Sequence, residues 1–354
     1  MRRTAFALLL LLLSVAAVPA ATPAGGPPPV GQTSVFARIG EPGSPEGIVV
    51  RGDVVYVGTH VSVRGNAGGP PSRIFTFHRV TGAATGSVEI QGQQTQATHG
   101  ILAMEFGPDG ALYVVDRNPG RIVRIDTVSG AQSVYATIPD LAPCAVSQPP
   151  CAPGLFAQEP TFADYLAFGP AGEVYVTDLQ ASTIFRVPPG GGLAAIWYQD
   201  ARFDSIFGLN GIVVDPAGTT LYFAMTGSLQ PDSPLQGVIY TLPIVPAPQA
   251  SDLAAFHTFL QPAAGPDGIA FGASGKLYVA LAGAGQVAIL NPDGSEAAIF
   301  PDPVANQVQE IPYDLPASVA FDGQGSLLVT NQSFFAGNAE HWAVLRAWVA
   351  DTAA

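Results

Sequence analysis

Residues 267–279 read DGIAFGASGKLYV, and this stretch decides the fold. It contains two short apolar runs, IAF and LYV, which are separated by a polar segment with Gly272 and Gly275. Short runs of aromatic and β-branched residues with glycine between them predict two β-strands joined by a tight turn. A single hairpin is too small to be stable by itself, so the stretch must belong to a larger β unit.

The same pattern occurs six times along the chain. Each copy starts one residue before a Gly-Ile-Ala-Phe-like run and ends in a Leu-Tyr-Val-like run. The other five copies are EGIVVRGDVVYV (46–57), LAMEFGPDGALYV (102–114), DYLAFGPAGEVYV (164–176), NGIVVDPAGTTLYF (210–223) and ASVAFDGQGSLLV (317–329). Internal similarity with a period of roughly 50 residues is the signature of a repeat architecture.

Two further strands are predicted after the hairpin of each repeat. Residues 121–125 and 183–187 are examples of the third strand, and 133–135 and 195–197 of the fourth. Four strands per repeat are typical of a propeller blade. The sequence therefore predicts an all-β fold, a six-bladed β-propeller with four-stranded blades.

The last repeat is one strand short, because only a third strand at 342–349 follows its hairpin. Residues 35–39 (VFARI) form a spare strand ahead of the first repeat. Pairing this N-terminal strand into the last blade closes the ring and leaves no open sheet edge there. We therefore expect the propeller to span residues 34–350, after a signal peptide at 1–20 and a Pro/Gly-rich leader at 21–33.

The composition excludes several classes of protein and partner. The chain has 40 Gly and 33 Pro among 354 residues, which argues against long helices. It has 14 Lys and Arg against 27 Asp and Glu, a net charge of -13, and Lys276 is its single lysine. Such a chain has no basic surface for nucleic acid or anionic lipid. We expect a monomer that binds a small molecule, with no nucleic-acid or membrane partner after signal cleavage.

The first residues and the two cysteines indicate export. Arg2 and Arg3 precede an apolar run at 5–18, and Val-Pro-Ala at 18–20 supplies a cleavage site near Ala20, as in a signal peptide. We therefore expect a secreted or periplasmic protein. Cys144 and Cys151 are the two cysteines of the chain. In an oxidising compartment they are expected to form a local disulfide.

Loop lengths indicate which face of the propeller binds ligands. The turns between the first and second strands of a blade are tight, as in GPDG at 107–110 and GPAG at 169–172. The loops predicted for the opposite face are long and irregular: 60–72, 139–160, 226–236, 301–316 and 331–341. Variable loops on one face of a rigid scaffold usually carry the binding site.

The first residue of each repeat copy should point toward the axis at the long-loop end of the channel. These residues are Glu46, Leu102, Asp164, Asn210, Asp267 and Ala317. Four of the six carry side-chain oxygens, and three carboxylates close together repel one another unless a cation binds or some remain protonated. Oxygen donors without thiols favour a hard ion, Ca²⁺ or else Mg²⁺. The competing interpretation is that Asn210-Gly211, Asp267-Gly268 and Glu46-Gly47 are ordinary turn or strand-entry pairs.

These segments resemble the SMP-30/gluconolactonase/LRE-like family of propellers. The similarity lies in SPEGI, LNGI and PDGI, each followed by the two strands of the repeat, and extends over roughly residues 40–335. The resemblance implies that Glu46, Asn210 and Asp267 bind the divalent metal and that Asp164 contacts substrate or metal. It also implies an arginine two residues before Asp164, where this chain has Phe162. That difference argues against an aldonolactone substrate.

The related lactonase and paraoxonase-type propellers suggest hydrolysis of a more apolar lactone or ester. Some of them use a histidine near the mouth of the channel on the second blade. His99 lies three residues before the column position Leu102, and a histidine side chain can act as a general base. The alternative is that His99 is a loop residue with no catalytic role.

Two functions are therefore compatible with the sequence. The first is a metal-dependent hydrolase of a lactone or related ester, in which Asp267, Asp164 or His99 takes the proton of the attacking water. The second is a non-enzymatic secreted propeller that binds a ligand or protein and holds a structural Ca²⁺. A deep, partly apolar cavity above the ion would favour the enzyme, and a blocked channel would favour the binding module.

Overall fold

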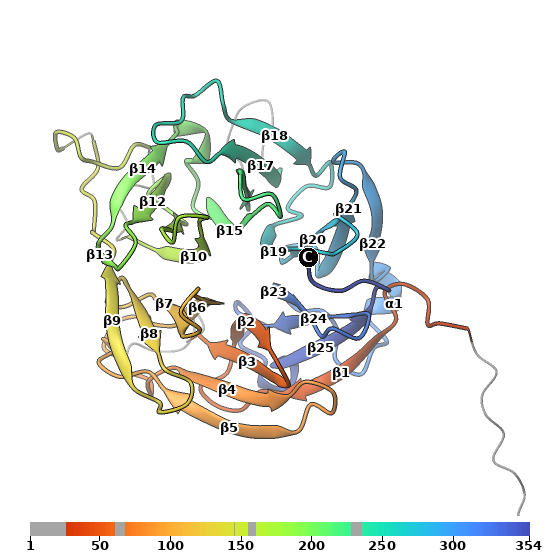
Figure 1. Ribbon diagram of the computed structural model, residues 1–354. Coiled ribbons are helices and arrows are strands. Elements are labelled where there is room, and N and C mark those ends of the chain that lie inside the picture. The colour runs from red at the N-terminus through yellow and green to blue at the C-terminus, as the bar shows by residue number, and fades with distance from the viewer. Residues whose placement is uncertain (1–25, 61–67, 145, 155–160, 228–235) are drawn as a thin grey trace, which may run out of the picture.

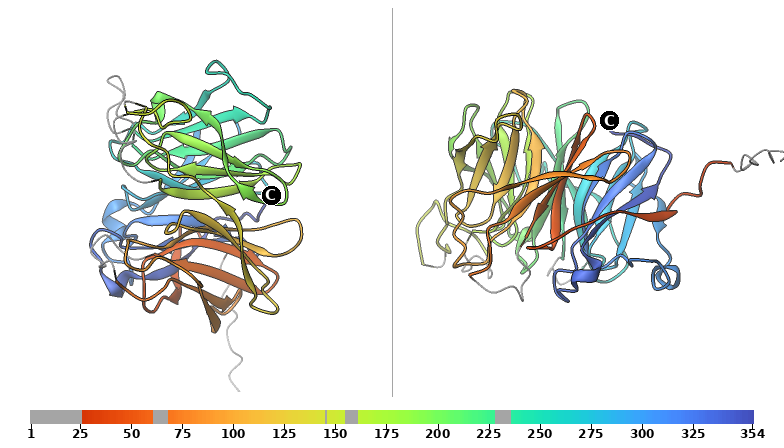
Figure 2. Two further views of the ribbon diagram at one scale, coloured as in Figure 1. Left: turned by 90° about the vertical axis from the view of Figure 1, so that its left-hand side faces the viewer. Right: turned by 90° about the horizontal axis from the view of Figure 1, so that it is seen from below.

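The computed structural model describes residues 26–354 except 61–67, 145, 155–160 and 228–235. Six small antiparallel sheets stand around a central axis like the blades of a propeller (Figure 1). Seen from the side, the blades form one disc with loops on both faces (Figure 2). The predicted six-bladed β-propeller is confirmed. The expected signal peptide at 1–20 lies outside the described residues.

Each blade begins with its innermost strand and runs outward. Blade 1 contains β2 (Pro45–Arg51), β3 (Val54–Thr59), β4 (Arg73–His78) and β5 (Ala84–Glu89). Blade 2 contains β6 (Ile101–Phe106), β7 (Leu112–Asp116), β8 (Arg121–Ile125) and β9 (Gln132–Thr137). Blade 3 contains β10 (Ala163–Phe168), β11 (Val174–Asp178), β12 (Thr183–Val187) and β14 (Ala195–Gln199).

The second half of the ring repeats this arrangement. Blade 4 contains β15 (Leu209–Val214), β16 (Thr220–Met225), β17 (Val238–Pro243) and β18 (Ala254–Thr258). Blade 5 contains β19 (Pro266–Phe271), β20 (Leu277–Leu281), β21 (Gln286–Leu290) and β22 (Glu296–Phe300). Blade 6 contains β23 (Pro316–Phe321), β24 (Ser326–Asn331) and β25 (Ala343–Trp348), with β1 (Thr33–Arg38) as its outer strand.

The ring closes through β1, as the sequence predicts. This strand pairs antiparallel with β25, from Thr33 opposite Ala347 to Arg38 opposite Ala343. Its Phe36 is buried against Phe77 of blade 1, with the ring centroids 6.3 Å apart. The first and the last strand of the chain therefore pair in one blade.

Four small elements were not predicted. Strand β13 (Gly192–Leu193) pairs parallel with β9 and so adds a fifth strand to the sheet of blade 2. Helix α1 (Pro303–Asn306) begins after Asp302, whose carboxylate accepts the backbone N–H groups of Val304 and Ala305. Single turns of 3₁₀ helix lie at Ala201–Phe203 and Ala339–His341.

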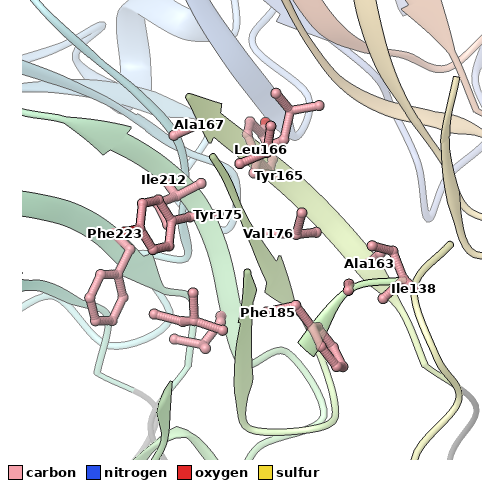
Figure 3. Close-up of a cluster of buried hydrophobic side chains, with 14 of the residues drawn as sticks. Ile138, Ala163, Tyr165, Leu166, Ala167, Tyr175, Val176, Phe185, Ile212 and Phe223 are labelled. Atoms are coloured by element: carbon pink, nitrogen blue, oxygen red, sulfur yellow. The ribbon is translucent and has the colours of Figure 1, made fainter. Parts of the chain in front are cut away.

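The repeated Tyr and Phe join neighbouring blades. The tyrosine of the second strand packs edge-on against the phenylalanine on the inner strand of the next blade, as in Tyr113 with Phe168 and Tyr278 with Phe321. The ring centroids are 4.9 and 5.0 Å apart in these two pairs. Such contacts add to the burial of each ring. Figure 3 shows part of the apolar cluster of blades 2, 3 and 4, including Tyr175. The repeat motif thus encodes the interface between blades.

Every inner strand is irregular at the same place. In each blade the pairing between the inner strand and the second strand shifts register at the first two residues of the repeat copy. In blade 5, for example, the shift lies between Pro266 and Ile269. The same shift occurs in β2, β6, β10, β15 and β23. A bulge bends a strand and redirects a side chain. The first residue of each repeat copy lies in this bulge in all six blades.

Candidate functional site

A cavity of about 230 Å³ lies on the long-loop face at the mouth of the channel. Four inner strands contribute oxygen-bearing side chains to its lining, namely Glu46, Asp164, Asn210 and Asp267. The long loops contribute the rest of the wall, including His60, Leu315 and Phe334. The structure therefore brings together the four polar residues of the predicted column. The two apolar members of the column, Leu102 and Ala317, are buried.

The glycine after three of these donors permits the blades to approach one another. A Cβ on Gly211 would lie 2.3 Å from the carbonyl oxygen of Asp267 in the next blade. A Cβ on Gly268 would lie 2.7 Å from the carbonyl oxygen of Ala317, and a Cβ on Gly47 would lie 2.9 Å from the carbonyl oxygen of Leu102. None of these three glycines has the positive φ of a turn glycine. The three dipeptides therefore lie at the entry of strands β2, β15 and β19, as one half of the competing interpretation expects, and not in turns.

Two buried threonines fix the backbone at the donors. Thr177 on β11 donates to the carbonyl oxygen of Asn210 at 2.7 Å, and Thr330 on β24 donates to that of Glu46 at 2.7 Å. Each hydroxyl also accepts a backbone N–H from its own blade, Thr177 at 3.1 Å from Tyr165. Each threonine thereby couples the second strand of one blade to the inner strand of the next.

The carboxylates are buried and close enough to interact. Burial raises the pKa of Glu46 well above its usual range, and the charges of Asp164 and Asp267 raise it further. Burial and the charge of Asp267 raise the pKa of Asp164 in the same direction. Burial raises the pKa of Asp267 to about 8, against hydrogen bonds from Tyr165 and the backbone of Gly268. All three groups therefore favour protonation unless positive charge is supplied.

Arg117 supplies one positive charge beside this ring. Its guanidinium lies over the ring of Phe162, 3.7 Å from the centroid, and its Nη1 is 3.2 Å from Nε2 of His60. The charge of Arg117 lowers the pKa of both Glu46 and Asp164 and partly offsets their burial. Sequence reasoning missed Arg117, because nothing in its local sequence shows that it faces a neighbouring blade. An arginine thus does lie beside Phe162, although it comes from blade 2.

Two buried oxygens of the ring have no hydrogen-bond donor in the described part of the chain: Oδ1 of Asp164 and Oδ1 of Asn210. The amide of Asn210 is oriented from its other side, since its Nδ2 donates to Oγ1 of Thr226 at 3.1 Å. Thr226 in turn donates to the carbonyl oxygen of Pro266 at 2.9 Å. Buried oxygens without donors, together with three carboxylates, fit a hard cation. Among the described residues, no group of three or more His, Cys, Asp or Glu side chains forms a metal site by itself.

His99 does not reach the cavity. Its Nδ1 lies 2.8 Å from the carbonyl oxygen of Ala97 and its Nε2 lies 2.9 Å from that of Pro70. Both ring nitrogens therefore face backbone, and His99 is absent from the described lining. The histidine that lines the cavity is His60, whose ring centroid is 5.1 Å from that of Phe334. Sequence analysis did not single out His60.

Tyr165 separates the cavity from the rest of the channel. Its hydroxyl lies 3.2 Å from Oδ1 of Asp267 and from the carbonyl oxygen of Ala317, and it contacts the hydroxyl of Ser318. A second cavity of about 510 Å³ occupies the opposite end of the channel, where burial raises the pKa of Glu105 to about 7. The polar ring is thus the floor of a pocket that opens on the long-loop face.

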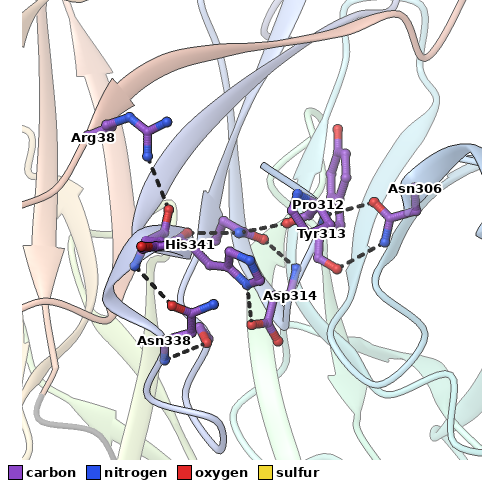
Figure 4. A network of polar contacts seen from close by, with 10 residues as sticks. Arg38, Asn306, Pro312, Tyr313, Asp314, Asn338 and His341 are labelled. Atoms are coloured by element: carbon purple, nitrogen blue, oxygen red, sulfur yellow. Dashed lines mark hydrogen bonds and ion pairs between the residues drawn. The ribbon is translucent and has the colours of Figure 1, made fainter. Parts of the chain in front are cut away.

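The long loops around this pocket are held by buried polar side chains. Asn331, at the end of β24, accepts the backbone N–H of Asp314 at 2.7 Å and donates to the carbonyl oxygens of Pro312 and His341 (Figure 4). The carboxylate of Asp314 lies 2.8 Å from Nδ1 of His341. The predicted disulfide is present between Cys144 and Cys151 in the loop between blades 2 and 3.

The chain is similar to known propellers in part of its sequence and in its whole fold. Residues 166–333 match the sequence model described as SMP-30/Gluconolactonase/LRE-like region, which confirms the resemblance over that stretch. No curated protein matches the chain at significant similarity. Solved structures match at low identity.

Three solved structures illustrate the range of propellers that share the fold. The aldose sugar dehydrogenase of Streptomyces coelicolor, in its PQQ-bound form, is 16% identical with a TM-score of 0.61 and coverage of 91% of this chain and 99% of the other. Regucalcin of Agrobacterium tumefaciens, a calcium-binding protein, is 16% identical with a TM-score of 0.56, and the match covers 88% of this chain and 91% of the other. A gluconolactonase of Xanthomonas campestris is 15% identical with a TM-score of 0.55, and the match covers 90% of this chain and 89% of the other. At these identities the likeness shows the fold alone.

The carboxylate ring predicts an unusual dependence of stability on pH. The folded-state pKa of Asp267 is about 8 against an ordinary value of 3.8. In the cation-free protein, the favourable contribution of the Asp267 carboxyl to the free energy of unfolding is complete below about pH 4. This contribution is lost as the pH rises toward 8. Asp267→Asn should therefore raise the free energy of unfolding at pH 8 by at least about 1 kcal/mol, with little change at pH 4. Urea unfolding in EDTA measures both values.

Asp293→Asn is the matched control for this prediction. Asp293 lies in a tight turn of blade 5, and hydrogen bonds from Ser295 lower the pKa of its carboxyl. Removing that charge should not stabilise the protein at pH 8. If Asp267→Asn likewise failed to raise the free energy of unfolding at pH 8, the ring would not be a site of charge repulsion.

Proposed function

We propose that this protein is a divalent-cation-dependent hydrolase of a lactone or related ester, with Ca²⁺ as the first candidate ion and Mg²⁺ as the second. The observation that carries the proposal is the floor of the pocket, where an oxygen of Asn210 is buried without a donor among the described residues and lies beside three carboxylates. The pocket above this floor is open and largely apolar, which favours an enzyme over a binding module with a structural ion.

The charges of the floor suit a single divalent ion. When ionised, Glu46, Asp164 and Asp267 carry three negative charges, and Arg117 beside them carries one positive charge. The charge of Asp178 also acts on Asp164 and Arg117, so at least two negative charges remain to be balanced, which favours a divalent cation. In the proposed site Glu46, Asn210 and Asp267 hold the ion. Asn210 and Asp267 lie within residues 166–333, which match the family model, and Glu46 lies outside that stretch.

Bound there, a divalent cation supplies Lewis acidity to the substrate carbonyl. Asp164 takes the proton of the attacking water, because its Oδ1 has no donor among the described residues and lines the pocket. Asp267 is less suited to this role, since its Oδ1 already accepts the Tyr165 hydroxyl at 3.2 Å. The hydrogen bond from Asn210 to Thr226 keeps the amide oxygen turned toward the floor. The base proposed here is therefore Asp164, and His99 has no part in the reaction.

The proposal includes export to a secreted or periplasmic location. The disulfide between Cys144 and Cys151 supports it, because such bonds persist in oxidising compartments. No helix in the described part of the chain is long and apolar enough to cross a membrane.

Calcium should stabilise the folded protein. A ligand that binds only the native state raises the unfolding temperature by mass action. Adding Ca²⁺ to EDTA-treated protein should raise the Tm of wild type, and Asn210→Ala should abolish this shift. Asn291→Ala, which removes an amide from a tight turn of blade 5, is the matched control and should keep it. Equal shifts in the two variants would place the ion elsewhere.

Turnover should separate the proton acceptor from the ion ligands. With Ca²⁺ at saturation, Asp164→Asn should lose about a hundredfold or more in kcat, the scale expected for a general base, while retaining the thermal shift. Asp267→Asn should weaken both turnover and the shift. The assay uses lactones, aryl esters and phosphotriesters with Ca²⁺ or EDTA.

His99→Gln serves as the control and should keep wild-type turnover, since His99 lies outside the pocket. Full activity of Asp164→Asn would reject the assignment of the base. Activity that persists in EDTA would reject the metal-dependent mechanism.

A further inference from the structure

The walls of the pocket differ in chemistry from its floor. Above the ring of oxygens the lining is formed by large apolar side chains: Phe162, Leu179, Ile206, Phe207, Phe334 and Phe335. Phe162 lies in the loop between blades 2 and 3, and Leu179 directly follows β11. Ile206 and Phe207 lie in the loop between blades 3 and 4, and Phe334 and Phe335 lie in the loop between β24 and β25 of blade 6, so separate loops form one apolar wall. Convergence of this kind indicates a surface shaped for a ligand.

The outer part of this wall is exposed to solvent. The relative exposure of Ile206 is 48%, that of Phe207 is 38% and that of Phe335 is 46%. The rings of Phe207 and Phe335 contact each other with centroids 5.8 Å apart, and Phe335 also contacts Phe334 at 5.4 Å. Grouped apolar side chains that stay exposed on a folded protein usually mark a binding surface.

The aromatic wall is held in place by its own loops. The backbone N–H of Ser333 donates to the carbonyl oxygen of Asp314 at 2.8 Å, and the Ser333 hydroxyl accepts the N–H of Asn338 at 3.1 Å. On the facing loop the N–H of Gly227 donates to the carbonyl oxygen of Phe207 at 2.9 Å. A wall fixed before binding loses little conformational entropy when a ligand enters.

The lining excludes two classes of substrate. None of the described lining residues is Lys or Arg, so no cationic side chain of the wall would pair with an anionic substrate. The polar groups of the wall are few, among them Ser205, Thr226 and Gln332. A polyhydroxylated lactone would therefore bury several hydroxyl groups against phenylalanine without partners, which is costly.

We propose that the substrate is a neutral lactone or ester with an alkyl or aryl substituent, which lies against Phe207 and Phe335 while its carbonyl reaches the polar floor. This inference rests on the proposed function and names its substrate class. Phe335 and Phe207 are specificity residues in this arrangement, and they act on the substituent rather than on the reacting carbonyl.

A series of γ-lactones with alkyl chains of increasing length tests the proposal. From γ-valerolactone to γ-decalactone, kcat/KM should rise by up to about fourfold for each added methylene until the wall is covered. Glucono-δ-lactone should be a poorer substrate than γ-octalactone. A flat series with glucono-δ-lactone preferred would overturn the proposal.

Variants of the wall locate the effect. Phe335→Ala and Phe207→Ala should each lower kcat/KM for γ-decalactone by about tenfold and leave γ-valerolactone within about twofold, because only the long chain reaches the rings. Phe335→Leu should recover most of the loss. Leu193→Ala removes an exposed apolar side chain from β13, away from the pocket, and should change neither substrate. Equal losses on both lactones would contradict the proposed role of the rings.

A binding measurement separates this proposal from the proposed function. The lactam counterpart of γ-decalactone resists hydrolysis, and by calorimetry it should bind at least about a hundredfold more tightly than the unsubstituted lactam, with a negative heat-capacity change. If the lactam binds in this way but no lactone is hydrolysed, the hydrolase proposal fails and the apolar site stands. If lactones are hydrolysed but the two lactams bind equally, the apolar site is wrong.

Discussion

The close approach of the inner strands around the axis is the constraint on which the rest of the structure depends. Blades 1, 4 and 5 meet the next blade through glycine, because a Cβ on Gly47, Gly211 or Gly268 would collide with a neighbouring backbone carbonyl. The bulge at the same place turns the preceding side chain toward the axis. The same short segment of each of these strands therefore packs the blades together and turns the side chain of Glu46, Asn210 or Asp267 toward the channel.

This arrangement collects like charges where water is scarce. Burial and mutual repulsion raise the pKa of Glu46 and Asp164, and Arg117 offsets only part of the cost. A fold under selection for stability alone would gain by replacing these acids with apolar residues, as the chain does at Leu102 and Ala317. Perturbed acids in a cavity are typical of functional sites. The acids are accordingly best explained by what they bind.

Much of this architecture could be predicted from the sequence, because it repeats. Six copies of one pattern fix the blades, and the alignment of the copies brings Glu46, Asp164, Asn210 and Asp267 to one end of the channel. The missing last strand predicts closure through β1.

Contacts between blades could not be predicted in the same way. Arg117 and His60 lie at the ends of second strands, and their direction is set by a neighbouring blade instead of by their own sequence. Tyr165 crosses the channel to blades 5 and 6, which no local pattern reveals. His99 is close in sequence to the column, yet backbone carbonyls take both of its ring nitrogens.

The most direct test of the central claim is to locate a divalent ion in the protein. Crystals grown with Mn²⁺ in place of Ca²⁺, and measured at a wavelength where manganese scatters anomalously, reveal the metal independently of the protein atoms. The account predicts one strong peak on the propeller axis, within coordination distance of Glu46, Asn210 and Asp267. No peak there at saturating Mn²⁺, or a peak on the tight-turn face, would contradict it.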